Sequence, residues 1–170
     1  MIETLMAAAI LIIGSISILT LIIDAIATNN RNKMDSTQSM LATSILEQIN
    51  STVIGSGSSS LTDCGGNTWN INTQPGGATL SGSAIDFTQD ISSWSTSTAS
   101  QQYFMNYVVT APCKNDGSGA FQGTYDVRWH VDAIGTSDTY LITVSARLKS
   151  HGEGNKFFSL PVTLRVMSGN

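Results

Sequence analysis

The sequence predicts an α+β fold in which one long N-terminal helix packs on a C-terminal antiparallel sheet. Three observations support it: an uncharged apolar run at the start, a second stretch without proline or glycine, and a final third in which apolar and polar residues alternate. Residues 1–54 are expected to form the helix and residues 55–170 a globular domain. Within that domain we expect a loop region over 55–102 and the sheet over 103–170.

The first half of the expected helix is apolar on all sides. After Glu3 the next charged residue is Asp24, so residues 4–23 form an uncharged run. At about 1.5 Å per residue, such a helix covers the roughly 30 Å of hydrocarbon in a bilayer. The run lacks the basic start, short apolar core and small-residue cleavage site of a secretory signal. It is also longer than the core of a domain of this size would cover, so the pattern favours a membrane span.

The second half of the helix is expected to be amphipathic and to pack on the sheet. The chain from Asp24 to Ile54 contains neither proline nor glycine. Apolar residues recur there on one helical stripe, made of Met34, Leu41, Ile45, Ile49 and Val53.

The loop region is rich in serine, threonine and glycine, as in GSGSSSLTDCGGN and QPGGATLSGS. Such composition is typical of solvent-facing loops. Large apolar residues interrupt it at intervals, which predicts a folded surface region with short strands or turns. These residues are Trp69, Ile71, Leu80, Ile85, Phe87, Ile91 and Trp94.

Alternation in the final third predicts an antiparallel meander with one apolar face. In residues 124–133 (TYDVRWHVDA), one face carries Tyr125, Val127, Trp129, Val131 and Ala133, while a face expected to be solvated carries Asp126, Arg128, His130 and Asp132. Residues 139–149 repeat the pattern, and so do residues 157–167, whose apolar face starts at Phe158. Residues 103–111 form a candidate fourth strand. Pro161 cannot donate to a ladder, which predicts an edge or a bulge in the last strand.

Cys64 and Cys113 are the two cysteines of the chain. A zinc site needs about four nitrogen or sulfur ligands, a CxxC redox pair is absent, and the two histidines, His130 and His151, lie on a strand and in a turn. We therefore expect a disulfide. Closing a loop of about 50 residues would stabilise the fold by about 4 kcal/mol in the chain-entropy model, and it implies an oxidising compartment.

Composition argues against several classes of function. The net charge is −4 and 12% of residues are charged, whereas nucleic-acid binding needs a basic patch. No nucleophile motif or phosphate-binding loop is present, and the residues 114–123 (KNDGSGAFQG) lack the alternating acidic ligands that calcium requires. The sequence therefore predicts no enzyme activity, no cofactor and no metal site.

Glu3 raises a separate question, because a carboxylate beside a long apolar run is costly to bury. In one reading Glu3 lies at the membrane interface, favoured by the positive end of the helix. In the other, a neighbouring copy of the chain supplies a cation, and the nearest candidate is its N-terminal amine. A buried pair of this kind would set the axial register between subunits.

MIETLMAAAILIIG, followed by a long helix, a Ser/Gly-rich loop region and a C-terminal sheet, resembles a bacterial type IV pilin or pseudopilin. YDVRWHVDA with the strand after it is similar to the minor pilin and pseudopilin group. In the family the glutamate is the fifth residue of the mature chain. Either two residues precede Met1, or Met1 is the mature start and the geometry between amine and carboxylate differs from that of the family. Glu3 matches that glutamate, to which recruitment and register against the neighbour's amine are attributed.

The resemblance implies a subunit that a prepilin peptidase cleaves and N-methylates. It would be held in the inner membrane and then extracted by the pilus assembly machinery into a homopolymeric filament on the cell surface. Gly14, flanked by Ser15 and Ser17, would favour either local melting of the helix on assembly or close helix packing. Two alternatives are a pseudopilin of a type II secretion-like system and a single-pass membrane-anchored periplasmic binding domain.

Overall fold

A computed structural model describes residues 2–52, 54, 57–89, 103–135, 138–150 and 160–169 of the chain. In these residues one long helix, α1 (Ile2–Asn50), precedes nine strands, and its last turns pack against an antiparallel sheet. The expected α+β fold is therefore confirmed. The chain divides into two compact units, Met1–Ser36 and Thr37–Asn170, which are described separately.

In the first unit, α1 runs without interruption from Ile2. Gly14 is the only glycine in the helix and proline is absent, so every residue can keep its helical hydrogen bond. The helix was expected to reach about residue 54, but it ends at Asn50 in the second unit. There the amide of Thr52 donates to the carbonyl of Ile49 at 3.2 Å, three residues back, so the last turn is tighter than α-helix.

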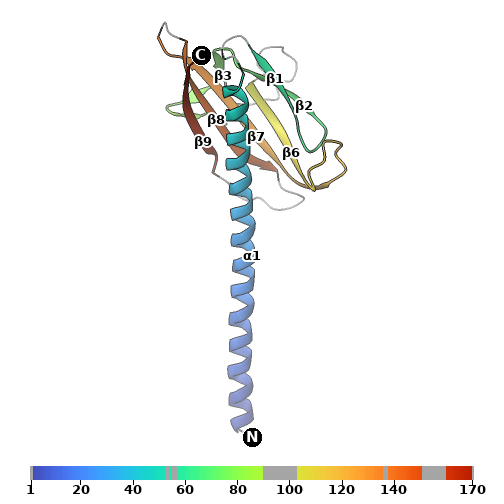
Figure 1. Cartoon of the computed structure of the whole chain (residues 1–170). Helices are drawn as coiled ribbons and strands as arrows, with labels where there is room; N and C mark the ends of the chain where they lie inside the picture. Colours follow the sequence, from blue (N-terminus) through green and yellow to red (C-terminus); the bar gives the residue numbers. More distant parts are fainter. Residues whose placement is uncertain are drawn as a thin grey trace. The chain divides into compact units, whose positions relative to one another are not determined.

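The last turns of α1, within the second unit, supply one side of the core. Leu41, Ala42, Ile45 and Ile49 are buried and belong to the same apolar cluster as the sheet residues. Figure 1 shows this end of α1 lying along the sheet that β6 to β9 form. The expected packing stripe is confirmed for Leu41, Ile45 and Ile49, Met34 is also buried, and Val53 lies outside the described residues.

The main sheet has five antiparallel strands. These are β3 (Gly76–Gly77), β6 (Phe104–Ala111), β7 (Ala120–Ala133), β8 (Thr139–Ser150) and β9 (Val162–Gly169). The central strand β7 pairs with β8 along one edge and with both β6 and β3 along the other. Strand β9 pairs with β8, so β7, β8 and β9 form the expected meander and β6 is the expected fourth strand.

The apolar face of the sheet matches the predicted alternation. Trp129 is fully buried at its centre, and its indole nitrogen donates to the carbonyl of Asn72 at 2.9 Å. Alternate residues of β7 and β8 surround it in the core: Val127, Val131, Ile142, Val144 and Ala146. Leu164 and Val166 of β9 pack against this cluster from the edge of the sheet.

The last strand starts later than the sequence pattern predicts. It was expected over residues 157–167, but β9 begins at Val162, and Leu160 is 69% exposed. Pro161 precedes the strand directly and has no amide hydrogen for a ladder, which accounts for a start after it. The expected edge position is confirmed, because β9 ends the strand order. Phe158 lies outside the described residues.

The loop region carries short strands, as expected. Two hairpins, β1 (Ser58–Thr62) with β2 (Thr68–Asn72) and β4 (Leu80–Ser81) with β5 (Ala84–Ile85), flank the two residues of β3. Ile71 and Ile85 are buried, and Trp69, Leu80 and Phe87 are half-buried. Ile91 and Trp94 lie outside the described residues.

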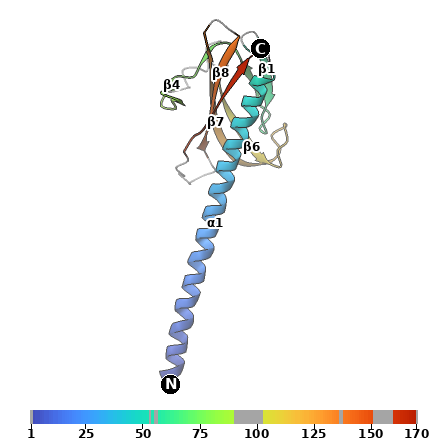
Figure 2. The ribbon, with the colours of Figure 1, turned by 60° about the vertical axis from the view of Figure 1, so that its left-hand side comes forward.

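The polar face of β7 was expected to be solvated, and this is wrong for Asp126 and Arg128, whereas the side chains of His130 and Asp132 are partly exposed. Asp126 and Arg128 are each 1% exposed. The segment of residues 79–89 covers them, because Arg128 donates to the backbone carbonyls of Asp86 and Gln89. Figure 2 shows β4, at the start of this segment, on the side of β7 away from α1.

Candidate functional site

The apolar half of α1 exposes a long surface of apolar side chains in the first unit. Every residue from Ile2 to Lys33 is exposed, including Ile10, Leu11 and Leu19. By length and composition, α1 could cross a membrane: its most apolar window has a mean hydropathy of 2.6 and is not buried at all. Surface of this extent needs an apolar environment, which either lipid or other helices can supply.

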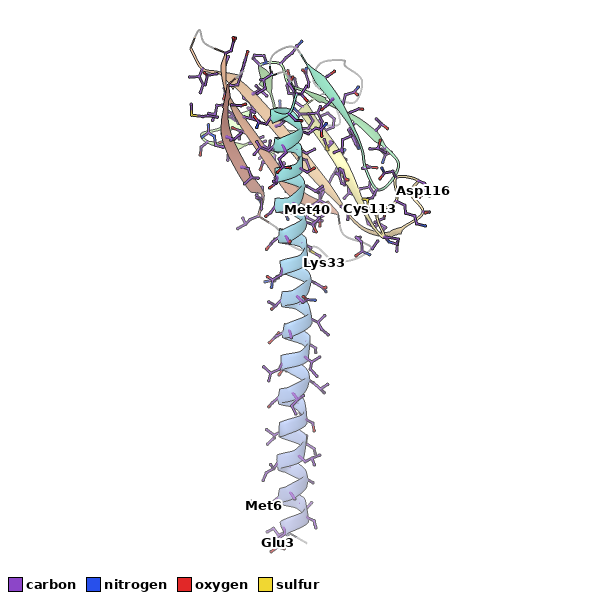
Figure 3. All side chains as sticks on the ribbon, viewed as in Figure 1. Glu3, Met6, Lys33, Met40, Cys113 and Asp116 are labelled. Carbon is purple, nitrogen blue, oxygen red and sulfur yellow. A yellow bond between two sulfur atoms is a disulfide. The ribbon has the colours of Figure 1, made fainter. Side chains whose placement is uncertain are left out.

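Glu3 lies in the first turn of this helix, where the unpaired amides of the helix favour a negative charge. Its side chain is exposed and makes no ion pair with any described residue. Figure 3 shows Glu3 and Met6 projecting from the first turns with only their own helix beside them. The carboxylate is therefore open to a cation from outside the chain.

Gly14 lies within continuous helix, and a Cβ atom placed there would meet nothing within 4 Å. The hydroxyls beside it are satisfied inside the helix: Ser15 donates to the carbonyl of Leu11 at 2.7 Å, and Ser17 to that of Ile13 at 2.9 Å. Such bonds leave the surface around Gly14 free of unpaired donors, which suits contact with lipid or with a closely packed helix. The isolated helix shows no break at this glycine.

In the second unit, Cys64 and Cys113 form the expected disulfide, which closes a sequence separation of 49 residues. It joins the turn between β1 and β2 to the loop after β6. The amide of Cys64 also donates to the carbonyl of Val108 at 3.1 Å, so a backbone bond supports the covalent one. Figure 3 places Cys113 and Asp116 in that same loop.

Asp63, next to the disulfide, holds the turn together. Its carboxylate accepts hydrogen bonds from the amides of Gly65, Asn67 and Val108, from the Asn67 side chain and from the indole of Trp69. Burial of Asp63 opposes its ionisation, but the bonds from Asn67, Trp69 and Val108 outweigh burial and place its pKa below the ordinary value. Both carboxylate oxygens of Asp63 are therefore engaged by donors of the fold, and its charge serves to hold the turn together.

A second buried cluster lies on the far face of β7. Asp126 pairs with both Arg128, at 3.0 Å through two parallel bonds, and Arg147, at 3.0 Å. The ring of Phe87 lies against both guanidinium groups, with centroid distances of 5.0 and 4.5 Å. Arg147 also donates to the carbonyl of Phe87. The cluster fastens residues 79–89 to the sheet and presents no open carboxylate.

The histidines and the glycine-rich loop show no catalytic arrangement among the described residues. His130 lies between two acceptors, the carbonyl of Ala78 at 2.7 Å from Nδ1 and the carboxylate of Asp132 at 2.9 Å from Nε2. In the loop at residues 114–119, bonds from Ser118 lower the pKa of Asp116. In the part of the chain that the structure describes, no group of three potential metal ligands occurs, and His151 lies outside that part.

Sequence reasoning missed Asp63 and the Asp126 cluster. The first carries a local signal, DCGGN, in which an aspartate precedes a Gly-Gly turn that it can cap. The second carries a signal in the two-residue spacing of Asp126 and Arg128, which places opposite charges on the same face of one strand. Neither signal reveals burial, because the segments that cover the two sites are distant in sequence: Val108 lies over Asp63, and residues 79–89 lie over the Asp126 cluster.

Comparison of the chain with protein-family models, with curated proteins and with solved structures finds no match.

Proposed function

We propose that this chain is a structural subunit that polymerises through the apolar half of α1 into a type IV pilus filament on the cell surface. One observation carries the proposal: an exposed apolar helix surface over residues 2–23 begins with a carboxylate, Glu3, that has no partner among the described residues. A helix that only anchors a domain in lipid has no use for that charge.

The apolar surface suits a subunit that exchanges lipid for neighbouring helices. Lipid tails and leucine-rich helices are similarly apolar, so the transfer changes the buried apolar area little. Packing and polar contacts then decide whether copies associate. The self-satisfied hydroxyls of Ser15 and Ser17 and the missing side chain of Gly14 allow close approach of a second helix.

Glu3 supplies the polar contact in this proposal. In a bundle of parallel copies its carboxylate is taken out of water and needs a cation, which the N-terminal amine of a neighbouring copy provides. Such a pair forms only at one axial offset and so fixes the register. Cleavage and N-methylation by a prepilin peptidase would generate that amine.

The disulfide supports a location for the second unit outside the cytoplasm. Disulfides persist in oxidising compartments such as the periplasm and the cell exterior. With the apolar half of α1 in the inner membrane before assembly, residues 37–170 would lie on the periplasmic side. Extraction into a filament would then carry them to the cell surface.

Two alternatives use the same helix. A pseudopilin of a type II secretion-like system would assemble by the same contacts into a short periplasmic filament, so filament length and abundance separate it from a pilin. A single-pass anchored binding domain would give Glu3 no role. The effect of losing the Glu3 carboxylate therefore separates this last class from the first two.

The test is the variant Glu3→Ala in cells that assemble the filament. The variant is expected to reach the membrane in normal amount but to lower filament yield at least about tenfold, since loss of one partner of a buried ion pair costs about 3 kcal/mol or more. Glu47→Ala, which removes an exposed carboxylate from the second unit, is the matched control and should assemble normally. Normal filament yield from Glu3→Ala would contradict the proposal.

A further inference from the structure

Two more charged side chains on the first unit have no partner among the described residues. Asp24 and Arg31 are both exposed on α1, and the side chain of neither makes a hydrogen bond or an ion pair with a described residue. They cannot pair with each other inside one helix, because seven residues at about 1.5 Å each separate them by about 10 Å along the axis. Lys33 and Asp35, by contrast, already have interactions within the chain.

Asp24 interrupts an apolar surface. Ile22 and Ile23 precede it, and Ala25 and Ile26 follow it, all of them exposed. Whatever covers the apolar surface up to Ile26 also takes the Asp24 carboxylate out of water. A carboxylate in that position is costly unless a cation and its hydrogen bonds replace the lost water.

The spacing of the two charges places them on one side of the helix. Seven residues are two turns with a drift of only about 20°, so Asp24 and Arg31 share a face. Glu3, Ile10 and Ser17 belong to the same seven-residue series. The face that carries Glu3 in the first turn therefore drifts slowly toward the face of Asp24 and Arg31.

We propose that Asp24 of one copy pairs with Arg31 of a neighbouring parallel copy that is displaced by about 10 Å along the helix axis, which is seven residues. This inference rests on the proposed function, because it specifies one contact within the polymer. The second copy is the fitting occupant since a single sequence supplies both halves of the pair. Arginine suits the role because its planar guanidinium binds a carboxylate through two parallel bonds.

The displaced contact is open-ended. In a helical array one face of α1 can lie between two neighbours, so that Asp24 contacts one of them and Arg31 the other, and the same pair repeats without closing. It is separate from the contact of Glu3 with an N-terminal amine, which belongs to the start of the helix. Both contacts would be satisfied in a helical array, where each copy has several neighbours.

Charge reversal tests the pair. In the full-length chain, Asp24→Arg alone and Arg31→Asp alone are each expected to lower filament yield about tenfold or more, because like charges then meet. The double variant Asp24→Arg/Arg31→Asp is expected to restore yield to within about twofold of the unmodified chain. The control Asp24→Arg/Lys114→Asp restores the net charge with an exposed loop residue and is expected not to restore yield.

Cysteine cross-linking tests the displacement without changing any charge. The variant Ile10→Cys/Ser17→Cys places two thiols seven residues apart on the same series. Oxidation of assembled filaments is expected to give a ladder of covalent multimers on a non-reducing gel. Ile10→Cys/Ile13→Cys, with a three-residue offset, is expected to give no ladder.

The outcomes separate this inference from the proposed function. Filaments from the unmodified chain, with no rescue by the double variant and no ladder, would overturn the Asp24–Arg31 pair and leave polymerisation standing. Rescue by the net-charge control would equally overturn it. Absence of filaments from the unmodified chain would overturn both proposals.

Discussion

At the residue scale, Asp63 shows how one buried carboxylate can order a glycine-rich turn. Five N–H groups converge on it, three from the backbone and two from the side chains of Asn67 and Trp69. Gly65 and Gly66 lie in this turn, and glycine loses more conformational freedom on folding than other residues. The carboxylate offsets that cost and positions Cys64 for its disulfide.

Replacing this carboxylate should destabilise the second unit. Asp63→Ala leaves buried donors without an acceptor and is expected to lower the free energy of unfolding by about 3 kcal/mol. The free energy of unfolding would be measured by urea titration of the full-length chain in detergent, with tryptophan fluorescence as the signal. Asp116→Ala, which removes an exposed turn carboxylate, should cost clearly less. Equal losses would mean that Asp63 does not hold the turn.

The same residue predicts a pH dependence. The pKa of Asp63 is lower in the folded chain than the value of about 3.9 expected when it is unfolded. Its stabilisation is therefore fully present above about pH 4 and is lost as the pH falls through the folded pKa. The stability difference between the unmodified chain and Asp63→Asn should shrink below pH 4, and a difference that is constant from pH 7 to pH 3 would contradict this.

At the scale of elements, β7 shows which features alternation can predict. The period of two assigned Val127, Trp129 and Val131 to the core face correctly, and it assigned Asp126 and Arg128 to the opposite face correctly. It could not indicate that Asp126 and Arg128 on this opposite face are also buried. That depends on residues 79–89, whose strands of two residues are too short to give a periodic signal.

Element boundaries were also harder to predict than element types. Strand β7 begins at Ala120, four residues before the alternating pattern, because it goes on pairing with β6 beyond a register shift between Val109 and Thr110. The helix and the three meander strands were predicted from long periodic runs. The disulfide was predicted by excluding other cysteine chemistry, whereas the roles of Glu3 and Gly14 depend on contacts between molecules.

The short strand β3 depends on a glycine that allows close approach to β7. A Cβ atom on Gly77 would lie 2.5 Å from the carbonyl oxygen of Trp129, and its φ of +134° is unfavourable for other residues. Gly77→Ala is therefore expected to lower the free energy of unfolding by about 3 kcal/mol. The measurement is the midpoint of urea unfolding.

Gly82→Ala is the control for this variant. Gly82 also has a positive φ, +65°, but a Cβ atom there would meet nothing within 4 Å. Its cost should be limited to the backbone strain of about 1 kcal/mol. If the two variants lose the same stability, close approach to Trp129 is not what requires glycine at residue 77.

At the scale of the whole molecule, the two units have different requirements. The second unit encloses a buried apolar core, a disulfide and two clusters of charged side chains. The first unit is continuous helix, but it leaves an apolar surface and the charged side chains of Glu3, Asp24 and Arg31 without partners among the described residues. This division favours a subunit whose exposed helix is completed by other copies.

Electron microscopy of material sheared from the cell surface, with mass spectrometry to quantify this chain in it, tests that claim most directly. The account predicts long helical filaments in which this chain is the dominant component. If the chain is found only in the membrane fraction and no filament contains it, that result would contradict the account.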